Sequence, residues 1–222
     1  MNRSPQASAG CDKHVVSIDG LQAEHDLRRA PAPCERIISN IAIHQIAIHC
    51  TITGQMMNRA GYPDDFLQFW TPRPHDRKLW FSIFTPQKGA NTSERLMPSQ
   101  RKQAIADLAI LRKHYPELDM PESMIRQFSP LPPGPGDRVF PLTTKTVSAN
   151  LKTVISSCQF GGNPDCSSCG CIASIRPAAI DQHKLGGVTL VSAIFRASLK
   201  VCKIRSLPAV QESKANEFQI LQ

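Results

Sequence analysis

The sequence predicts an α/β fold in which a parallel sheet is covered by helices. Apolar runs with strand character alternate with segments of helical character: strands at 14–18, 46–53 and 78–85, helices beginning near Pro33, Pro63 and Pro98. This alternation favours parallel pairing, because each helix carries the chain back to the same end of the sheet. The run at 78–85 is apolar on both faces, which is typical of a buried parallel strand.

The first two strands are recognised by their side-chain patterns. HVVSI (14–18) is a short apolar run that is closed by Asp19 and Gly20, a turn-forming pair. In IAIHCTIT (46–53) apolar side chains alternate with a mixed set. We therefore expect one apolar face and one polar face that carries His49.

Proline residues mark the predicted helix starts. Pro63 is followed by two aspartates, which suits a first turn, where proline is tolerated and acids face the positive end of the dipole. Pro98 opens a longer helix, and Asp119 with Pro121 predicts the cap and first turn of a short one. His25 and Asp26 are expected in a turn. The aromatic residues Trp70, Trp80 and Phe81 are expected in the core.

A change of composition divides the chain. The segment SPLPPGPGD separates a predicted region 1–128 from a predicted region 129–222. In the second region the residues around Asn150 are typical of a hairpin, and Pro177 is expected to limit any helix that starts at Cys171.

The composition describes a globular chain. Of its 222 residues, 41% are hydrophobic and 20% are charged, as in folded domains. The net charge is +8, but the basic residues are scattered and are not interleaved with aromatic ones, so nucleic acid is not an expected partner. The sequence has neither an apolar signal segment nor a run of membrane-spanning length, so no membrane association is expected. We expect a cytoplasmic, reducing location, where thiols bind metals more often than they form disulfides.

Half of the eight cysteines lie close together: Cys158, Cys166, Cys169 and Cys171. Their spacing is C-x7-C-x2-C-x-C, and the residues between them include glycines and a proline. Four thiolates are the ligand set of a zinc ion or of an iron–sulfur cluster. Two disulfides are the alternative, but a pair as close as Cys169 and Cys171 would be strained. The spacing predicts a metal or cluster site and leaves the metal open.

Several stretches resemble radical S-adenosylmethionine (radical SAM) enzymes. VVSIDGLQAEHDLRR (15–29) resembles the fourth barrel strand and the following turn of that family, IAIHCTIT the next strand, and LWFSIFTPQKG the sixth. CQFGGNPDCSSCGCIAS resembles the C-terminal segment in which a bacterial branch of the family binds an auxiliary 4Fe–4S cluster. The resemblance covers about residues 14–200. It implies half of a β/α barrel over 1–128 and a cysteine-rich appendage over 129–222.

The resemblance also implies roles for individual residues. Ser17 and Arg29 would contact the carboxylate of S-adenosylmethionine, and the four clustered cysteines would hold the auxiliary cluster. The family generates its radical on a cluster held by C-x3-C-x2-C, and this spacing is absent here, where Cys11, Cys34 and Cys50 are isolated. We therefore expect a truncated or split member without independent radical catalysis.

Two alternatives remain beside this expectation. The first is a zinc protein in which the four cysteines support a structural or interaction module. The second is a subunit completed in trans by a separate N-terminal half that carries the missing motif. A half barrel would also expose the edge of its first strand, so self-association is expected.

Overall fold

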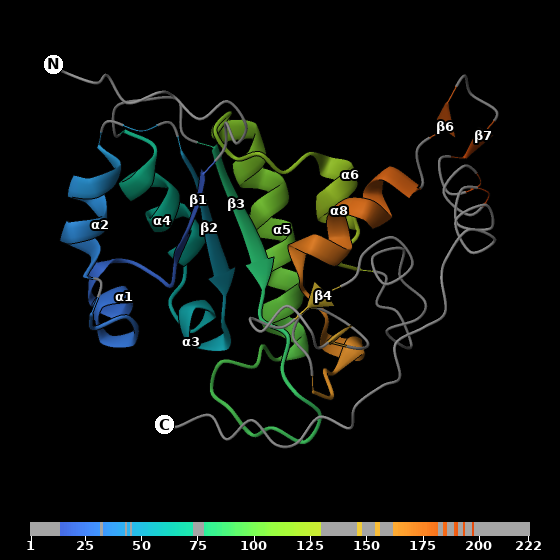
Figure 1. Cartoon of the computed structure of the whole chain (residues 1–222), viewed down its shortest axis with the longest axis horizontal. Helices are drawn as coiled ribbons and strands as arrows, with labels where there is room; N and C mark the ends of the chain where they lie inside the picture. The colour runs from blue at the N-terminus through green and yellow to red at the C-terminus, as the bar shows by residue number, and fades with distance from the viewer. Residues whose placement is uncertain are drawn as a thin grey trace, which may run out of the picture.

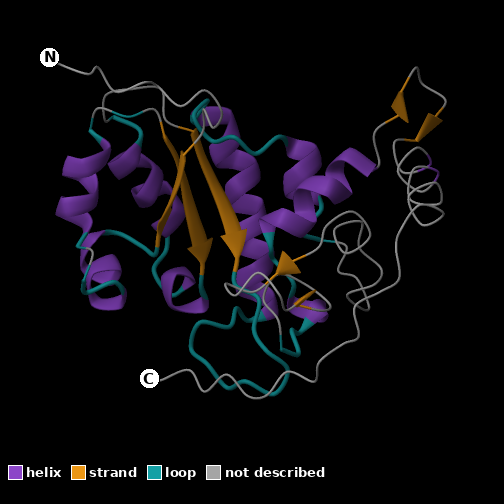
Figure 2. Ribbon diagram, viewed as in Figure 1, coloured by secondary structure: helices purple, strands orange, loops and turns teal. Residues whose placement is uncertain are grey.

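The computed structural model describes residues 14–31, 33–42, 44, 46–72, 78–129, 146–147, 154–155, 162–181, 184–185, 189–190, 193 and 197. Within these residues the fold is mixed α/β, with a small parallel sheet flanked by helices (Figures 1 and 2). No helix of this part is long and apolar enough to cross a membrane.

The central sheet has three strands in the order β1-β2-β3, which are β1 (His14–Ile18), β2 (Ile46–Ile52) and β3 (Lys78–Ile83). Both pairings are parallel. The prediction of a parallel sheet is confirmed, and so are the positions of its strands. At the register Ser17–His49–Trp80, three side chains of the same face lie side by side across the sheet.

Helices connect and cover the strands. Their bounds are α1 (Gln22–Arg28), α2 (Cys34–Ile41), α3 (Gly54–Met57), α4 (Tyr62–Trp70), α5 (Pro98–His114), α6 (Glu122–Arg126), η2 (Cys166–Ser168, a 3-10 helix) and α8 (Ile172–Asp181). In α4, Phe66 meets Phe81 of β3 edge to face, with ring centroids 5.5 Å apart. On α8, Arg176 lies over the ring of Trp80 at 4.4 Å. Because residues 80 and 81 point to opposite faces, α4 and α8 cover opposite sides of the sheet.

The core lies between the sheet and the helices on the α4 side. The predicted apolar face of β2 is buried, with no side chain more than 6% exposed: Ile46, Ile48, Cys50 and Ile52. Trp70 and Phe81 are also buried, as predicted. Trp80 is only partly buried, since it faces the other side of the sheet and packs beneath Arg176. The prediction of a core tryptophan therefore holds only in part at this position, because Trp80 packs against the core without being fully buried in it.

The outer edge of β3 is covered. Near its start, the Leu79 amide donates to the Glu117 carbonyl at 2.9 Å, and the Asp119 amide donates back to Leu79 at 2.8 Å. At its end, the Ile83 amide donates to the Gly170 carbonyl at 2.9 Å. In contrast, β1 pairs only with β2 within the described residues. Within the described residues the sheet therefore has one covered edge, that of β3, and one open edge, that of β1.

Three sequence expectations need correction. His25 and Asp26 lie in helix α1 rather than in a turn, and the Asp26 carboxylate accepts the Cys34 amide at 2.6 Å, at the start of α2. Helix α6 starts after Pro121, and Asp119 does not cap it. Helix α8 runs through Pro177. It does so because it packs on α6 and β3 with Ile175 fully buried, which holds the helix across one missing backbone hydrogen bond.

The short strands outside the main sheet form two antiparallel pairs. The first joins β4 (Thr146–Val147) to β5 (Val154–Ile155) and confirms the hairpin predicted around Asn150. The second joins β6 (Lys184–Leu185) to β7 (Thr189–Leu190) and was not predicted. The proposed division between 128 and 129 lies next to residues 130–145, which are outside the described residues.

Candidate functional site

The cysteine segment lies along the end of β3 and the residues that follow it. Backbone hydrogen bonds of 2.8 to 2.9 Å join the two stretches: Ile83 to Gly170, Asp165 to Pro86, and Lys88 to Asn163. The Gly170 amide also donates to the Thr85 hydroxyl at 2.9 Å. Residues 163–170 are therefore fixed to the carboxyl end of a sheet strand, although the bonded residues lie 75 or more positions apart in sequence.

Gly170 allows this close approach. A Cβ at this position would lie 2.2 Å from the Ile83 carbonyl oxygen and 2.4 Å from the Ile83 Cβ. These atoms belong to a buried strand and have no room to move away. The glycine between the last two cysteines is therefore required by packing against β3.

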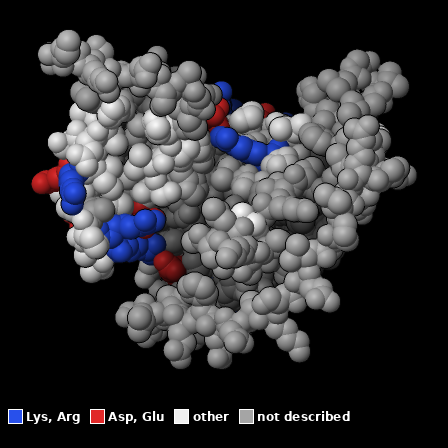
Figure 3. Space-filling view, in the orientation of Figure 1, with Lys and Arg blue, Asp and Glu red and all other residues white. Residues whose placement is uncertain are grey.

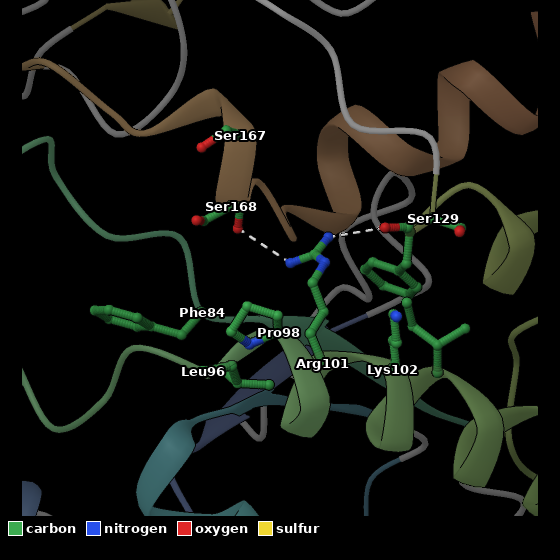
Figure 4. A pocket seen from close by; sticks show the side chains of 10 residues that line it. Phe84, Leu96, Pro98, Arg101, Lys102, Ser129, Ser167 and Ser168 are labelled. Carbon is green, nitrogen blue, oxygen red and sulfur yellow. Dashed lines mark hydrogen bonds between the residues drawn. The ribbon is translucent and has the colours of Figure 1, made fainter.

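Arg101 of α5 binds the segment from the other side. Its guanidinium donates to three backbone carbonyls, those of Ser168 at 3.1 Å, Cys169 at 2.6 Å and Phe128 at 2.9 Å. Figure 4 shows the Arg101 side chain rising from α5 between the two stretches that it joins. One cation thus joins backbone carbonyls from two segments that are far apart in sequence.

Asp165 organises the first turn of the segment. Its carboxylate accepts the Ser167 amide at 3.1 Å and the hydroxyls of Ser167 and Ser168, and it forms an ion pair with Arg95. Burial acts to raise the pKa of Asp165, but the hydrogen bonds from the two serines and the charge of Arg95 together hold it below its ordinary value. The carboxylate therefore stays ionised and caps η2.

Three of the four predicted ligands lie in the described residues, and their thiols are buried. Cys166, Cys169 and Cys171 are at most 9% exposed. Cys171 immediately precedes α8. Burial raises the pKa of its thiol, and the backbone N–H groups of Ser174 and Ala173 offset only part of this rise. Cys158 lies outside the described residues.

The described thiols do not form a coordination shell. No group of three or more cysteine, histidine, aspartate or glutamate side chains within the described residues is arranged to hold a metal ion. The described cysteines are not joined in disulfides either. Three of the four predicted ligands thus lie in one short segment, and their role as metal ligands stays a prediction.

A polar pair on the α8 side of the sheet contacts the residue after Cys171. His49 Nε2 lies 2.8 Å from the Ser82 hydroxyl oxygen, which also accepts the Ile172 amide at 3.3 Å. Burial lowers the pKa of His49, and the Arg176 charge lowers it further, while Asp19 acts in the opposite direction. The neutral ring is therefore favoured, and it links β2 to the start of α8 through Ser82.

The residues predicted to contact S-adenosylmethionine lie on the edge strand β1 and at the end of α1. Ser17 is exposed on β1. Arg29 follows α1 and donates through Nε to the Asp19 carboxylate at 2.6 Å, and this hydrogen bond raises the pKa of Arg29. No hydrogen bond within the described part joins Ser17 to Arg29. The structure therefore gives Arg29 a partner that the sequence prediction did not include.

Asp19 and Gly20 form the predicted turn, with added contacts. The Asp19 amide donates to the Nδ1 atom of buried His25 at 3.1 Å. Gly20 has a φ of 147°, and a Cβ there would lie 2.8 Å from the Tyr62 hydroxyl. That hydroxyl accepts the Leu21 amide at 2.8 Å. The turn at the end of β1 is therefore tightly held.

No protein-family model, curated protein or solved structure matches this chain.

Sequence reasoning missed the residues that hold the cysteine segment in place. Arg101 and Arg95 lie in α5 and in the loop before it, far from the cysteines in sequence, and both belong to ordinary polar stretches. Asp165 had a local signal, because an aspartate before Cys-Ser-Ser is typical of a capping residue.

Proposed function

We propose that this chain binds an iron–sulfur cluster of the 4Fe–4S type, with Cys158, Cys166, Cys169 and Cys171 as ligands. The observation that carries the proposal is the setting of the three described thiols, which are buried in one segment whose backbone is fixed to the end of a strand. A buried, rigidly supported ligand segment limits the access of water to a metal centre and tunes its properties.

The charges around the segment suit an anionic centre. Arg101 donates to the Cys169 carbonyl, Arg95 pairs with Asp165, and α8 begins directly after Cys171. Cations and helix N-termini favour thiolates over thiols. In the metal-free chain burial still raises the pKa of Cys171. Binding of the metal would therefore release protons.

The donor set fits a cluster in kind and in number, and its members must converge when the metal binds. Within the described residues no three of them meet at one point. Coupling of metal binding to local folding is common among sites built from thiolates. When bound, the cluster would supply an electron-transfer centre.

We propose further that the three-stranded sheet is part of a half β/α barrel of the radical SAM type and that the chain carries out no radical chemistry alone. The parallel order β1-β2-β3 and the strand lengths support the barrel. The absence of the C-x3-C-x2-C spacing from the sequence supports the lack of independent catalysis. The open edge of β1 supports association with a separate N-terminal half or with another copy of this chain.

The metal is tested by anaerobic reconstitution with iron and sulfide. We expect about one cluster per chain, with a brown colour and with sulfide released in acid. Cys169→Ala should abolish cluster binding, because the loss of one thiolate opens the shell. Cys50→Ala, a matched change of a buried cysteine in β2, should leave it intact. Stoichiometric zinc without iron or sulfide would contradict the proposal and favour a four-cysteine zinc module.

The lack of catalysis has its own test. Reconstituted protein incubated with dithionite and S-adenosylmethionine should give no 5′-deoxyadenosine above a control without protein. Product that disappears in Cys169→Ala would contradict this part of the proposal, because the C-terminal cysteines would then support the radical chemistry themselves.

A further inference from the structure

We propose that a cavity beside the cysteine segment binds a small amphipathic anion, which is a molecule with one carboxylate or phosphate group on a short apolar body. The cavity has a volume of about 330 Å³ and lies between the start of α5 and the segment 167–168 (Figure 4). It is distinct from the proposed cluster site, since no cysteine lines it within the described residues.

The inner wall of the cavity is apolar. Phe84 follows β3, Leu96 lies before α5, Ile105 belongs to α5, and Phe128 follows α6. Four separate parts of the chain thus contribute large apolar side chains to one hollow. Its volume lies near the lower end of the roughly 300–1,000 Å³ that small-molecule pockets occupy, which favours a small ligand over a cofactor of nucleotide size.

The charge of the cavity is positive. Arg101 and Lys102 both line it, and no lining residue within the described part is acidic. The nearby Asp165 carboxylate is bonded by two lining serines, but its charge is already paired with Arg95. The Lys102 ammonium group beside an apolar wall favours an anion that has an apolar body.

Lys102 is the cation that is free to bind a ligand. Arg101 uses its guanidinium to donate to three backbone carbonyls, so its role is structural. Lys102 is exposed and has no ion pair or hydrogen bond with any other described residue. The Ser129 hydroxyl, also at the rim, has no bond to the described part either. A cation and a hydroxyl donor are the groups that a carboxylate or a phosphate requires.

The test uses the full chain in its metal-free, reduced form, so that it does not depend on the proposed cluster. Binding is measured by titration calorimetry. Octanoate and octyl phosphate are the anionic probes, octylamine is the cationic control of equal chain length, and octanol is the uncharged one. We expect at least one anion to bind and neither control to bind comparably. Equal binding of all four probes, or binding of none, would overturn the proposal.

Two variants locate the site. Lys102→Gln should weaken anion binding by roughly fivefold to tenfold, which lies between the effects of an exposed ion pair and of a charge-assisted hydrogen bond. Lys113→Gln removes the same charge from the last turn of the same helix and should change binding by less than twofold. Equal losses in the two variants would mean that only net charge matters and would overturn the site.

A third variant tests the apolar wall. Ile105→Trp fills the cavity from α5, and Ile105 is only partly buried, so the helix should tolerate the larger ring. We expect binding to be lost while the melting temperature stays close to that of the original chain. Unchanged affinity in this variant would place the anion elsewhere.

Discussion

Arg101 offers the sharpest test of how the cysteine segment is held. Arg101→Ala removes three hydrogen bonds, to the carbonyls of Phe128, Ser168 and Cys169. Each is worth about 1 kcal/mol net, so the local opening of the segment should become about 3 kcal/mol easier. Because 1.4 kcal/mol is a factor of ten, the open population should rise about a hundredfold. Global stability should fall much less, since the core between α4 and the sheet is untouched.

The measurement is the rate of thiol alkylation at each cysteine, followed by peptide mass spectrometry under native conditions. Where closing is faster than alkylation, the rate at Cys166, Cys169 and Cys171 reports the open population of the segment. Cys34 and Cys50 are buried in α2 and β2 and supply internal controls, because their rates report wider unfolding.

Arg112→Ala is the matched control variant. Arg112 lies on the same helix and has no ion pair or hydrogen bond in the described part of the chain. The thiol alkylation rates of this variant should equal those of the original protein. If Arg101→Ala leaves the three segment thiols as slow as before, then Arg101 does not anchor them. If all five described thiols become faster together, the variant has lowered the stability of the whole fold, and the local anchoring is refuted.

Other contacts give further expectations. Gly170→Ala would place a Cβ 2.2 Å from the Ile83 carbonyl oxygen, so we expect a loss of about 1–3 kcal/mol in the free energy of unfolding by urea; an unchanged transition would contradict the close packing. Val15 is 50% exposed on the edge strand β1, and Val15→Lys should reduce self-association in sedimentation velocity, because a charge on an edge blocks strand pairing. Equal sedimentation of both proteins would argue against association through β1. Burial lowers the His49 pKa, so the stability contributed by the neutral ring is complete above the unfolded-state pKa of about 6.5 and is lost as the pH falls below it. His49→Gln, which can still bond Ser82, should make the melting temperature less sensitive to pH between about 7 and 5, and an equally steep decline would assign the acid sensitivity to another group.

The sheet could be predicted from sequence because its signals are local. Alternating apolar residues identified β2, and prolines identified the starts of α4 and α5. Helix α1 was missed because QAEHDLR carries no apolar stripe. It is held instead by buried His25, whose ring accepts the Asp19 amide, and such a contact has no signature in the sequence.

The candidate site could be predicted only in part. Spacing located the cysteines, but the bonds that position them join residues far apart in the chain, such as Arg101 and Cys169 or Ile83 and Gly170. The donors in these bonds bind backbone carbonyls. Because every residue has a backbone carbonyl, no pattern of side chains in the sequence identifies the acceptor. The expectation that Pro177 would limit the helix failed for a similar reason. The burial of Ile175 outweighs the hydrogen bond that is missing at Pro177 in α8.

The two edges of the sheet together limit the stoichiometry of any assembly. Leu118 and Gly170 occupy the backbone of β3 on its outer side, so strand addition there is blocked, whereas β1 is open in the described part. A chain with two open edges can add copies at both ends and grow into a fibre. A chain with one open edge has no edge left for another copy once that edge has paired. Two copies joined at β1 around a twofold axis would leave no free edge, so the assembly would close as a dimer.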